Sequence, residues 1–134
     1  MTITVVRDPT ARMRHEIQIG PHKVAIDASV ADGGEGLGPN PHDLYDAALG
    51  ACEALTVLWY ANRKHLAVET LSVSVDRDQT EEHNGTYRLH STFKIGGKLT
   101  EAQRQELLSV AARCPIHKLM TSVQTIITVS LDPR

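Results

Sequence analysis

The stretch of residues 41–65 constrains the fold of this chain more than any other feature of its sequence. Asn40 is a good N-cap, Pro41 suits the first helical position, and Asp43 places a negative charge in the first turn of a helix. The residues that follow are apolar or small on nearly every side of such a helix. We therefore expect a long central helix that is buried on most of its faces and carries Cys52, one of only two thiols in the chain.

Two apolar stripes run along this predicted helix. One stripe holds Leu44, Ala47, Ala48, Ala51, Cys52, Leu55, Trp59 and Asn62, and the other holds Tyr45, Leu49, Thr56 and Tyr60. Only Asp46, Gly50 and Glu53 form a short polar or small line between the stripes. The many alanines let other backbones come close, so the helix is predicted to be the rod around which the other elements pack.

Length and charge narrow the class of protein. The 134 residues match one domain spanning 1–134, and a net charge of -2 gives no electrostatic case for binding nucleic acid. Residues 1–7 are too short and too charged for a secretory signal, and Asp46, Glu53 and Asn62 argue against a membrane-spanning helix. We expect a soluble, cytoplasmic protein with no membrane partner, whose two cysteines are free or redox-active.

The segments before the central helix are predicted to form strands. Residues 2–6, 14–19 and 23–27 are expected to form an antiparallel meander, with turns at Asp8-Pro9-Thr10 and Gly20-Pro21-His22. Residues 31–40 contain four glycines but fit neither the dinucleotide-binding nor the P-loop pattern, so they are interpreted as a flexible connection.

The segments after the central helix are predicted to form a hairpin, two helices and a strand. Strands are expected at 71–76 and 87–95, joined by a turn that contains Asn84-Gly85. The capping box Thr100-Glu101-Ala102-Gln103 opens a helix that extends to about Arg113, and a short helix runs from Pro115 through Met120. Residues 122–131 are predicted to form a final strand. This order predicts an α+β fold with helices on one side of mainly antiparallel sheet.

The two cysteines are the strongest candidates for chemistry. Cys114 directly precedes Pro115, so it is predicted near a helix N-cap, where the helix end lowers the pKa of a thiol. With a peroxide, one thiolate forms a sulfenic acid and the second thiol converts it to a disulfide. A buried cysteine can equally serve only as a small apolar side chain.

A reactive thiolate needs a positive charge nearby. Arg7, Arg12 and Arg14 are the candidates near the N-terminus, and Asp43 or Glu35 could hold such a guanidinium in place. Along one helix, nine residues at about 100° each put Asp43 on the face opposite Cys52 and about 13 Å away along the axis. Asp43 is therefore expected to serve the helix start or to act on a thiol of another subunit.

Zinc binding is the competing chemistry. Cys114 and His117 have ligand-like spacing, but no second Cys/His pair matches it and structural zinc sites need four ligands. We predict no metal and no cofactor.

Four motifs together resemble the OsmC/Ohr family, the osmotically inducible and organic hydroperoxide resistance proteins, and most closely its OsmC-like branch. These motifs are Gly38-Pro39-Asn40-Pro41-His42-Asp43-Leu44, Ala47-Ala48-Leu49-Gly50-Ala51-Cys52, Tyr60-Ala61-Asn62-Arg63-Lys64 and Arg113-Cys114-Pro115-Ile116-His117. The resemblance implies an intertwined homodimer in which antiparallel sheets wrap around two long central helices, one from each subunit. It also implies thiol-dependent reduction of organic hydroperoxides, with a dithiol reductant such as a lipoyl protein.

By motif position, the resemblance makes Cys52 the peroxidatic thiol and Cys114 the resolving thiol. The family also uses an arginine from the N-terminal hairpin, placed first on Arg14 and second on Arg12, and a glutamate at the start of the central helix. This sequence departs from the family at the glutamate, because His42 occupies its position and Asp43 stands beside it. Pairing of Asp43 with Arg14 is one arrangement that follows.

Two other functions fit the same scaffold. A cleft between subunits could bind a hydrophobic small molecule, and the thiols would then have no role in the function. The presence of His42 in place of the family's glutamate favours this alternative. A redox-sensing stress protein, whose disulfide changes a contact with a partner, is the third alternative.

Overall fold

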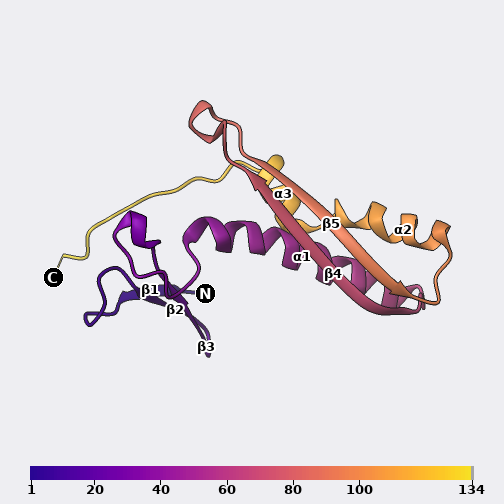
Figure 1. The fold of residues 1–134 in the computed structure, drawn as a ribbon, viewed down its shortest axis with the longest axis horizontal. Helices are drawn as coiled ribbons and strands as arrows, with labels where there is room; N and C mark the ends of the chain where they lie inside the picture. Colours follow the sequence, from indigo (N-terminus) through magenta and orange to yellow (C-terminus); the bar gives the residue numbers. More distant parts are fainter. Residues whose placement is uncertain (134) are drawn as a thin grey trace. The chain divides into compact units, whose positions relative to one another are not determined.

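The computed structural model describes residues 1–133, and Figure 1 shows its helices and strands. In chain order these elements are β1 (Ile3–Arg7), β2 (His15–Ile19), β3 (His22–Ile26), the 3-10 helix η1 (Val30–Asp32), α1 (Pro41–Arg63), β4 (Val68–Asp78), the 3-10 helix η2 (Glu82–Asn84), β5 (Arg88–Gly97), α2 (Glu101–Ala111) and α3 (Pro115–Thr121). The chain divides into two compact units, residues 1–47 and residues from 48 onward, and α1 spans their boundary.

The first unit contains the predicted antiparallel meander. Strands β1, β2 and β3 form one sheet in that order, with Val5 opposite Ile17 and Ile17 opposite Val24. The meander is therefore confirmed, with strand ends within about two residues of those predicted.

The glycine-rich connection is more ordered than the sequence indicated. Asp27 is 4% exposed and its carboxylate accepts hydrogen bonds from the backbone N–H groups of Ala28, Glu35 and Leu37. A Cβ on Gly34 would lie 2.1 Å from the carbonyl oxygen of Ala28, so only glycine fits at this position. The segment is a connection, as predicted, but the buried carboxylate holds it in one conformation.

Helix α1 begins as the sequence predicts. The Asn40 side chain accepts a hydrogen bond from the backbone N–H of Asp43 at 2.9 Å, and the Asp43 carboxylate accepts one from the Asn40 N–H at 3.0 Å. This reciprocal pair satisfies two backbone donors at the helix start. The helix ends at Arg63 rather than at His65, which has a φ of 55°.

The second unit is built on the β4–β5 hairpin, which lies alongside α1 and α2 (Figure 1). The hairpin is confirmed, and Asn84-Gly85 lies in the loop that joins its two strands, as predicted. These residues end η2 within that loop, and Gly85 has a φ of 92°. The pairing of Val73 with Phe93 and Leu71 with Ile95 places the apolar residues of both strands on the face that meets the helices.

The face of α1 that packs on this hairpin includes Gly50 and Glu53, which belong to the line of polar or small residues described above. Gly50 and Glu53 are buried, and a Cβ on Gly50 would lie 2.8 Å from Cγ2 of Val75. Further along, Val57 and Ala61 form the core with Leu107 and Ala111 of α2. Because glycine lets the strand approach closely, the two helices and the hairpin can share one apolar core.

The expectation that α1 is buried on most faces is wrong for the single chain. Leu55 is 69% exposed and Trp59 59% exposed, and both belong to the predicted apolar stripe. The stripe lies on the side of α1 away from the line formed by Gly50 and Glu53, so the hairpin of the same chain does not cover it.

The C-terminal helices are confirmed, whereas the final strand is wrong. Thr100 and Gln103 form the predicted capping box of α2, and Pro115 is the first residue of α3. Residues 122–133 have no regular secondary structure, and Ile126, Ile127, Val129 and Leu131 are each at least 79% exposed. An alternating pattern indicates a strand only where a neighbouring strand supplies hydrogen bonds, and this segment has no such neighbour in the described chain.

None of the helices within residues 1–133 combines the length and the apolar character needed to cross a membrane.

The contact between Gly50 and Val75 gives a direct test of the packing of α1. Replacing a helical glycine by alanine normally stabilises a helix by about 1 kcal/mol. We expect Gly50→Ala instead to destabilise the protein by about 1–3 kcal/mol, because the new methyl group overlaps Val75. In a Val75→Ala background the same substitution should become neutral or stabilising. Denaturant unfolding of the four proteins measures this change of sign, and equal effects in both backgrounds would contradict the packing.

Candidate active site

The two thiols of the chain interact within the second unit. Cys52 lies on α1 and is partly exposed, whereas Cys114, at the start of α3, is 0% exposed. The Cys52 thiol lies close enough to Cys114 to raise the pKa of its thiol, and both cysteines are free. The folded chain therefore brings together two cysteines that are far apart in the sequence.

Cys114 is the N-cap of α3, as predicted. Its sulfur accepts a hydrogen bond from the backbone N–H of His117 at 3.2 Å, and Pro115 occupies the first helical position. Burial nevertheless raises the pKa of the Cys114 thiol, and the Cys52 thiol and the Glu53 carboxylate raise this pKa further. The hydrogen bond from the His117 N–H at the helix start lowers the pKa of Cys114, as predicted from the sequence, but burial raises this pKa by more.

Glu53, which was not predicted from the sequence, also acts on the Cys114 thiol. The Glu53 side chain is 6% exposed, and its Oε1 accepts a 2.6 Å hydrogen bond from the Ser91 hydroxyl on β5. Ser91 also lines a cavity of about 420 Å³ between β5 and α2. One signal could have identified Glu53, namely that it is a carboxylate directly after Cys52 in the most apolar stretch of the chain.

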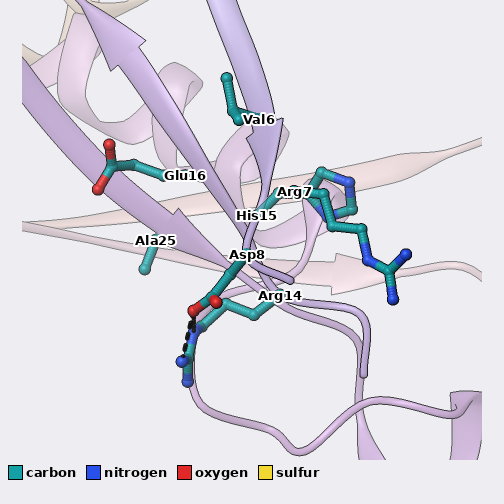
Figure 2. Close-up of a pocket in the computed structure, with 7 residues that line it drawn as sticks. All are labelled: Val6, Arg7, Asp8, Arg14, His15, Glu16 and Ala25. Carbon is teal, nitrogen blue, oxygen red and sulfur yellow. Dashed lines mark hydrogen bonds and ion pairs between the residues drawn. The ribbon is translucent and has the colours of Figure 1, made fainter. Parts of the chain in front are cut away.

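The predicted arginine, Arg14, lies in the first unit and pairs with Asp8 (Figure 2). Both Nε and Nη2 of Arg14 donate to Oδ2 of Asp8, at 3.2 Å and 2.7 Å. The two residues lie beside a cavity of about 280 Å³ lined by Val6, Arg7, Asp8, Arg14, His15, Glu16 and Ala25. The acid that holds the guanidinium is thus Asp8, which was predicted only as part of a turn.

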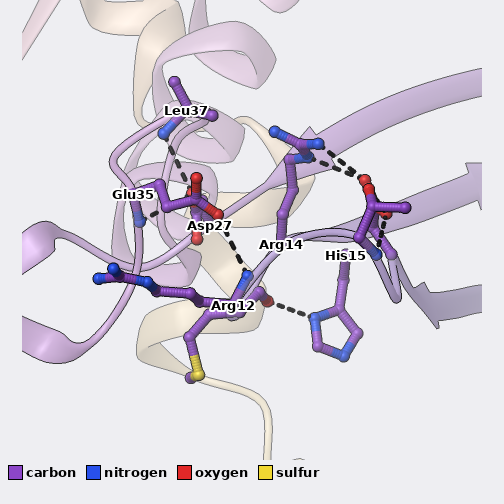
Figure 3. Close-up of polar contacts among 9 residues, drawn as sticks. Arg12, Arg14, His15, Asp27, Glu35 and Leu37 are labelled. Carbon is purple, nitrogen blue, oxygen red and sulfur yellow. Dashed lines mark hydrogen bonds and ion pairs between the residues drawn. The ribbon is translucent and has the colours of Figure 1, made fainter.

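Further acids act on Arg14 at longer range. The hydrogen bond to Asp8 raises the pKa of Arg14 most, and the charges of Glu35 and Asp27 add to the effect. Figure 3 shows Asp27 at the centre of this group, with Glu35 accepting a 3.1 Å hydrogen bond from the backbone N–H of Arg12. Glu35 was a candidate acid from the sequence. It accepts a hydrogen bond from the loop backbone, and its negative charge raises the pKa of Arg14.

Asp43 has the first of its two predicted roles, that of serving the helix start. It caps the start of α1 through its reciprocal hydrogen bonds with Asn40. A catalytic role of Arg14 and Asp43 stays a prediction.

The described residues offer no clear metal centre. Within residues 1–133, no cluster of three or more His, Cys, Asp or Glu side chains is arranged to hold a metal ion.

The protein is therefore an α+β protein that holds two neighbouring thiols, one of which caps a helix. The family model described as "OsmC-like protein" matches residues 33–129, and the chain belongs to this OsmC-like family. No protein among the curated sequences matches the chain.

Solved structures share the fold at low sequence identity. An osmotic stress induced and detoxification response protein of Psychrobacter arcticus 273-4 is 18% identical, with a TM-score of 0.74 over 88% of this chain and 86% of that one. An OsmC-like protein of Mycoplasma pneumoniae is 22% identical, with a TM-score of 0.72 over 91% and 87%. The organic hydroperoxide resistance protein OhrB of Bacillus subtilis is 21% identical, with a TM-score of 0.59 over 91% and 92%. These similarities establish the OsmC-like fold.

The ion pair in the first unit predicts an unusual titration. Hydrogen bonds from the Thr10 side chain and then from Arg14 lower the pKa of Asp8 from 3.8 to about 2. Since the folded pKa lies below the unfolded one, the Asp8 carboxylate stabilises the fold above pH 3.8, and this contribution is lost as the pH falls towards 2. Carbon-13 NMR of the carboxyl group should show a midpoint near 2. Thr10→Val and Arg14→Met should each raise this midpoint, and a midpoint that neither substitution raises would contradict the assignment of causes.

Proposed function

We propose that this protein is a thiol-dependent peroxidase that reduces organic hydroperoxides through a two-cysteine cycle. The observation that carries the proposal is the interaction between the Cys52 and Cys114 thiols inside one unit of the fold. Membership of the OsmC-like family supports it, as do neighbours of the same fold that are described as organic hydroperoxide resistance proteins.

The proposed first step occurs at Cys52, which is the more exposed of the two thiols. Its thiolate attacks the terminal peroxide oxygen of ROOH, the O–O bond breaks, and the products are Cys52–SOH and ROH once the alkoxide takes a proton. We assign Arg14 the positive charge that stabilises this thiolate, and Asp43 the acidic position at the start of the helix. Both assignments come from the family motif rather than from a contact with Cys52.

The proposed second step joins the two sulfurs. The Cys114 thiol attacks the sulfenic sulfur of Cys52, the S–O bond breaks, and a disulfide and one water form. A dithiol such as a lipoyl group then reduces the disulfide by thiol–disulfide exchange and is itself oxidised to a cyclic disulfide. A dithiol reductant of this kind fits the cytoplasm, which is the proposed place of action.

We also propose that residues 1–134 act as one OsmC-like domain within a homodimer. The exposed side chains of Leu55 and Trp59 on α1 support a second copy as the partner, because they form an uncovered apolar stripe on the central helix. The exposed apolar segment of residues 122–133 supports the same arrangement, since a strand-like sequence without a neighbour can pair with another chain.

Single substitutions separate the roles of the two cysteines. Cys52→Ser should reduce consumption of cumene hydroperoxide, with a dithiol as reductant, to the uncatalysed rate. Cys114→Ser, the matched control, should still consume about one equivalent and accumulate a sulfenic acid that dimedone traps, but should form no intramolecular disulfide. If the Cys52→Ser protein consumes peroxide like the wild type, Cys52 is not the peroxidatic residue and the proposal is wrong.

A further inference from the structure

The cavity of about 420 Å³ between β5 and α2 takes no part in the cycle described above. All of the residues that line it belong to these two elements, and neither thiol is among them. Figure 1 shows α2 alongside β5, after the loop that joins them. Small-molecule sites in proteins have volumes of about 300–1,000 Å³. The cavity is therefore large enough for a ligand of its own.

Apolar side chains line the cavity from both sides. Phe93 and Ile95 of β5 are half-buried and pack against the core of the second unit. Leu108 of α2 is 44% exposed, whereas its neighbour Leu107 is buried in that core. Leu108 therefore offers apolar surface to the cavity rather than to the core, and such walls suit the hydrocarbon part of a ligand.

Arg104 supplies a fixed positive charge to the same cavity. Its Nε donates a 3.1 Å hydrogen bond to the carbonyl oxygen of Ile95, and its Nη1 donates one of 3.3 Å to that of Leu99. Both acceptors are uncharged, so these contacts hold the guanidinium in place without neutralising it. Within residues 1–133 its second amino group, Nη2, makes no hydrogen bond. A half-buried guanidinium of this kind favours a carboxylate as its partner.

The other polar groups narrow the choice of ligand. The Ser91 hydroxyl donates its hydrogen to Glu53, so it does not offer a donor to an anion. Glu101 lines the cavity one turn before Arg104, and its carboxylate accepts a 3.1 Å hydrogen bond from the Gln105 amide. This second negative charge disfavours a doubly charged anion such as phosphate more than a singly charged one.

We propose that this cavity binds a small organic carboxylate, with its charged end on Arg104 and its hydrocarbon part between Phe93 and Leu108. The site is separate from the thiol pair and does not depend on the proposed peroxidase activity. Its ligand is recognised by one negative charge joined to an apolar group, so both parts are needed for binding.

A pair of probes tests this requirement on the unaltered protein. Two-dimensional NMR of ¹⁵N-labelled protein follows the side-chain Nε–H of Arg104 and the backbone N–H groups of Phe93 and Leu108. Addition of 4-phenylbutyrate should shift these signals in a saturable way. The uncharged amide, 4-phenylbutyramide, should bind at least about tenfold more weakly, because it cannot form the charge-assisted hydrogen bonds. Absence of saturable shifts with the acid, or equal binding of acid and amide, would overturn the proposal.

Substitutions on α2 locate the binding site of 4-phenylbutyrate. Leu108→Trp fills the cavity and should weaken binding at least about tenfold, whereas Ala102→Trp, at an exposed position outside the cavity, is the matched control and should leave it unchanged. Glu101→Gln removes the competing negative charge and should strengthen binding by about threefold. The NMR spectrum of each variant without ligand checks its fold. Unchanged binding in Leu108→Trp, or weaker binding in Glu101→Gln, would contradict the proposed site.

Discussion

The close contact between one face of α1 and the β4–β5 hairpin positions the thiol chemistry of this chain. Gly50 lets Val75 approach the helix backbone, and Glu53 accepts the hydrogen bond from Ser91 one turn further on. These contacts fix the rotation of α1 about its own axis. Because Cys52 is on the same helix, on the side away from Gly50 and Glu53, that rotation also fixes the direction of its side chain. A bulky residue at position 50 would disturb the core and the thiol pair together.

The electrostatics of the site differ from those of a simple activated thiol. Cys114 caps α3 and accepts a backbone hydrogen bond, but burial and the neighbouring carboxylate oppose its ionisation. Desolvation dominates because no water reaches the sulfur, whereas the cap supplies a single donor. A thiol held neutral in this way suits the second step of a two-cysteine cycle, in which the thiol attacks an oxidised partner rather than a peroxide.

Local chemistry allowed much of the fold to be predicted from the sequence. Asn40, Thr100 and Cys114 were each expected to start a helix, and each does so through a side-chain hydrogen bond to the backbone. The meander and the hairpin followed from alternating apolar residues and turn residues. The motifs that resemble the OsmC/Ohr family led to the correct family, which the match over residues 33–129 establishes.

The errors arose where a property depends on neighbours distant in the sequence. Residues 122–131 have the pattern of a strand but no partner in the described chain, and the stripe that includes Trp59 is apolar but exposed. The short polar line on α1 became the buried face because Gly50 permits close packing, which composition alone does not reveal. Asp8 was read as a turn residue, since nothing in its local sequence indicates an ion pair with Arg14 across the hairpin loop.

The central claim is that one chain can join its own two sulfurs. Treatment of the reduced wild-type protein with one equivalent of cumene hydroperoxide, followed by alkylation, proteolysis and mass spectrometry, tests this claim most directly. The account predicts one major product, in which the peptides that contain Cys52 and Cys114 of the same chain are linked by a disulfide and have lost two hydrogen atoms. Recovery of both cysteines as alkylated thiols, or of Cys52 as a sulfinic acid with Cys114 still reduced, would contradict it.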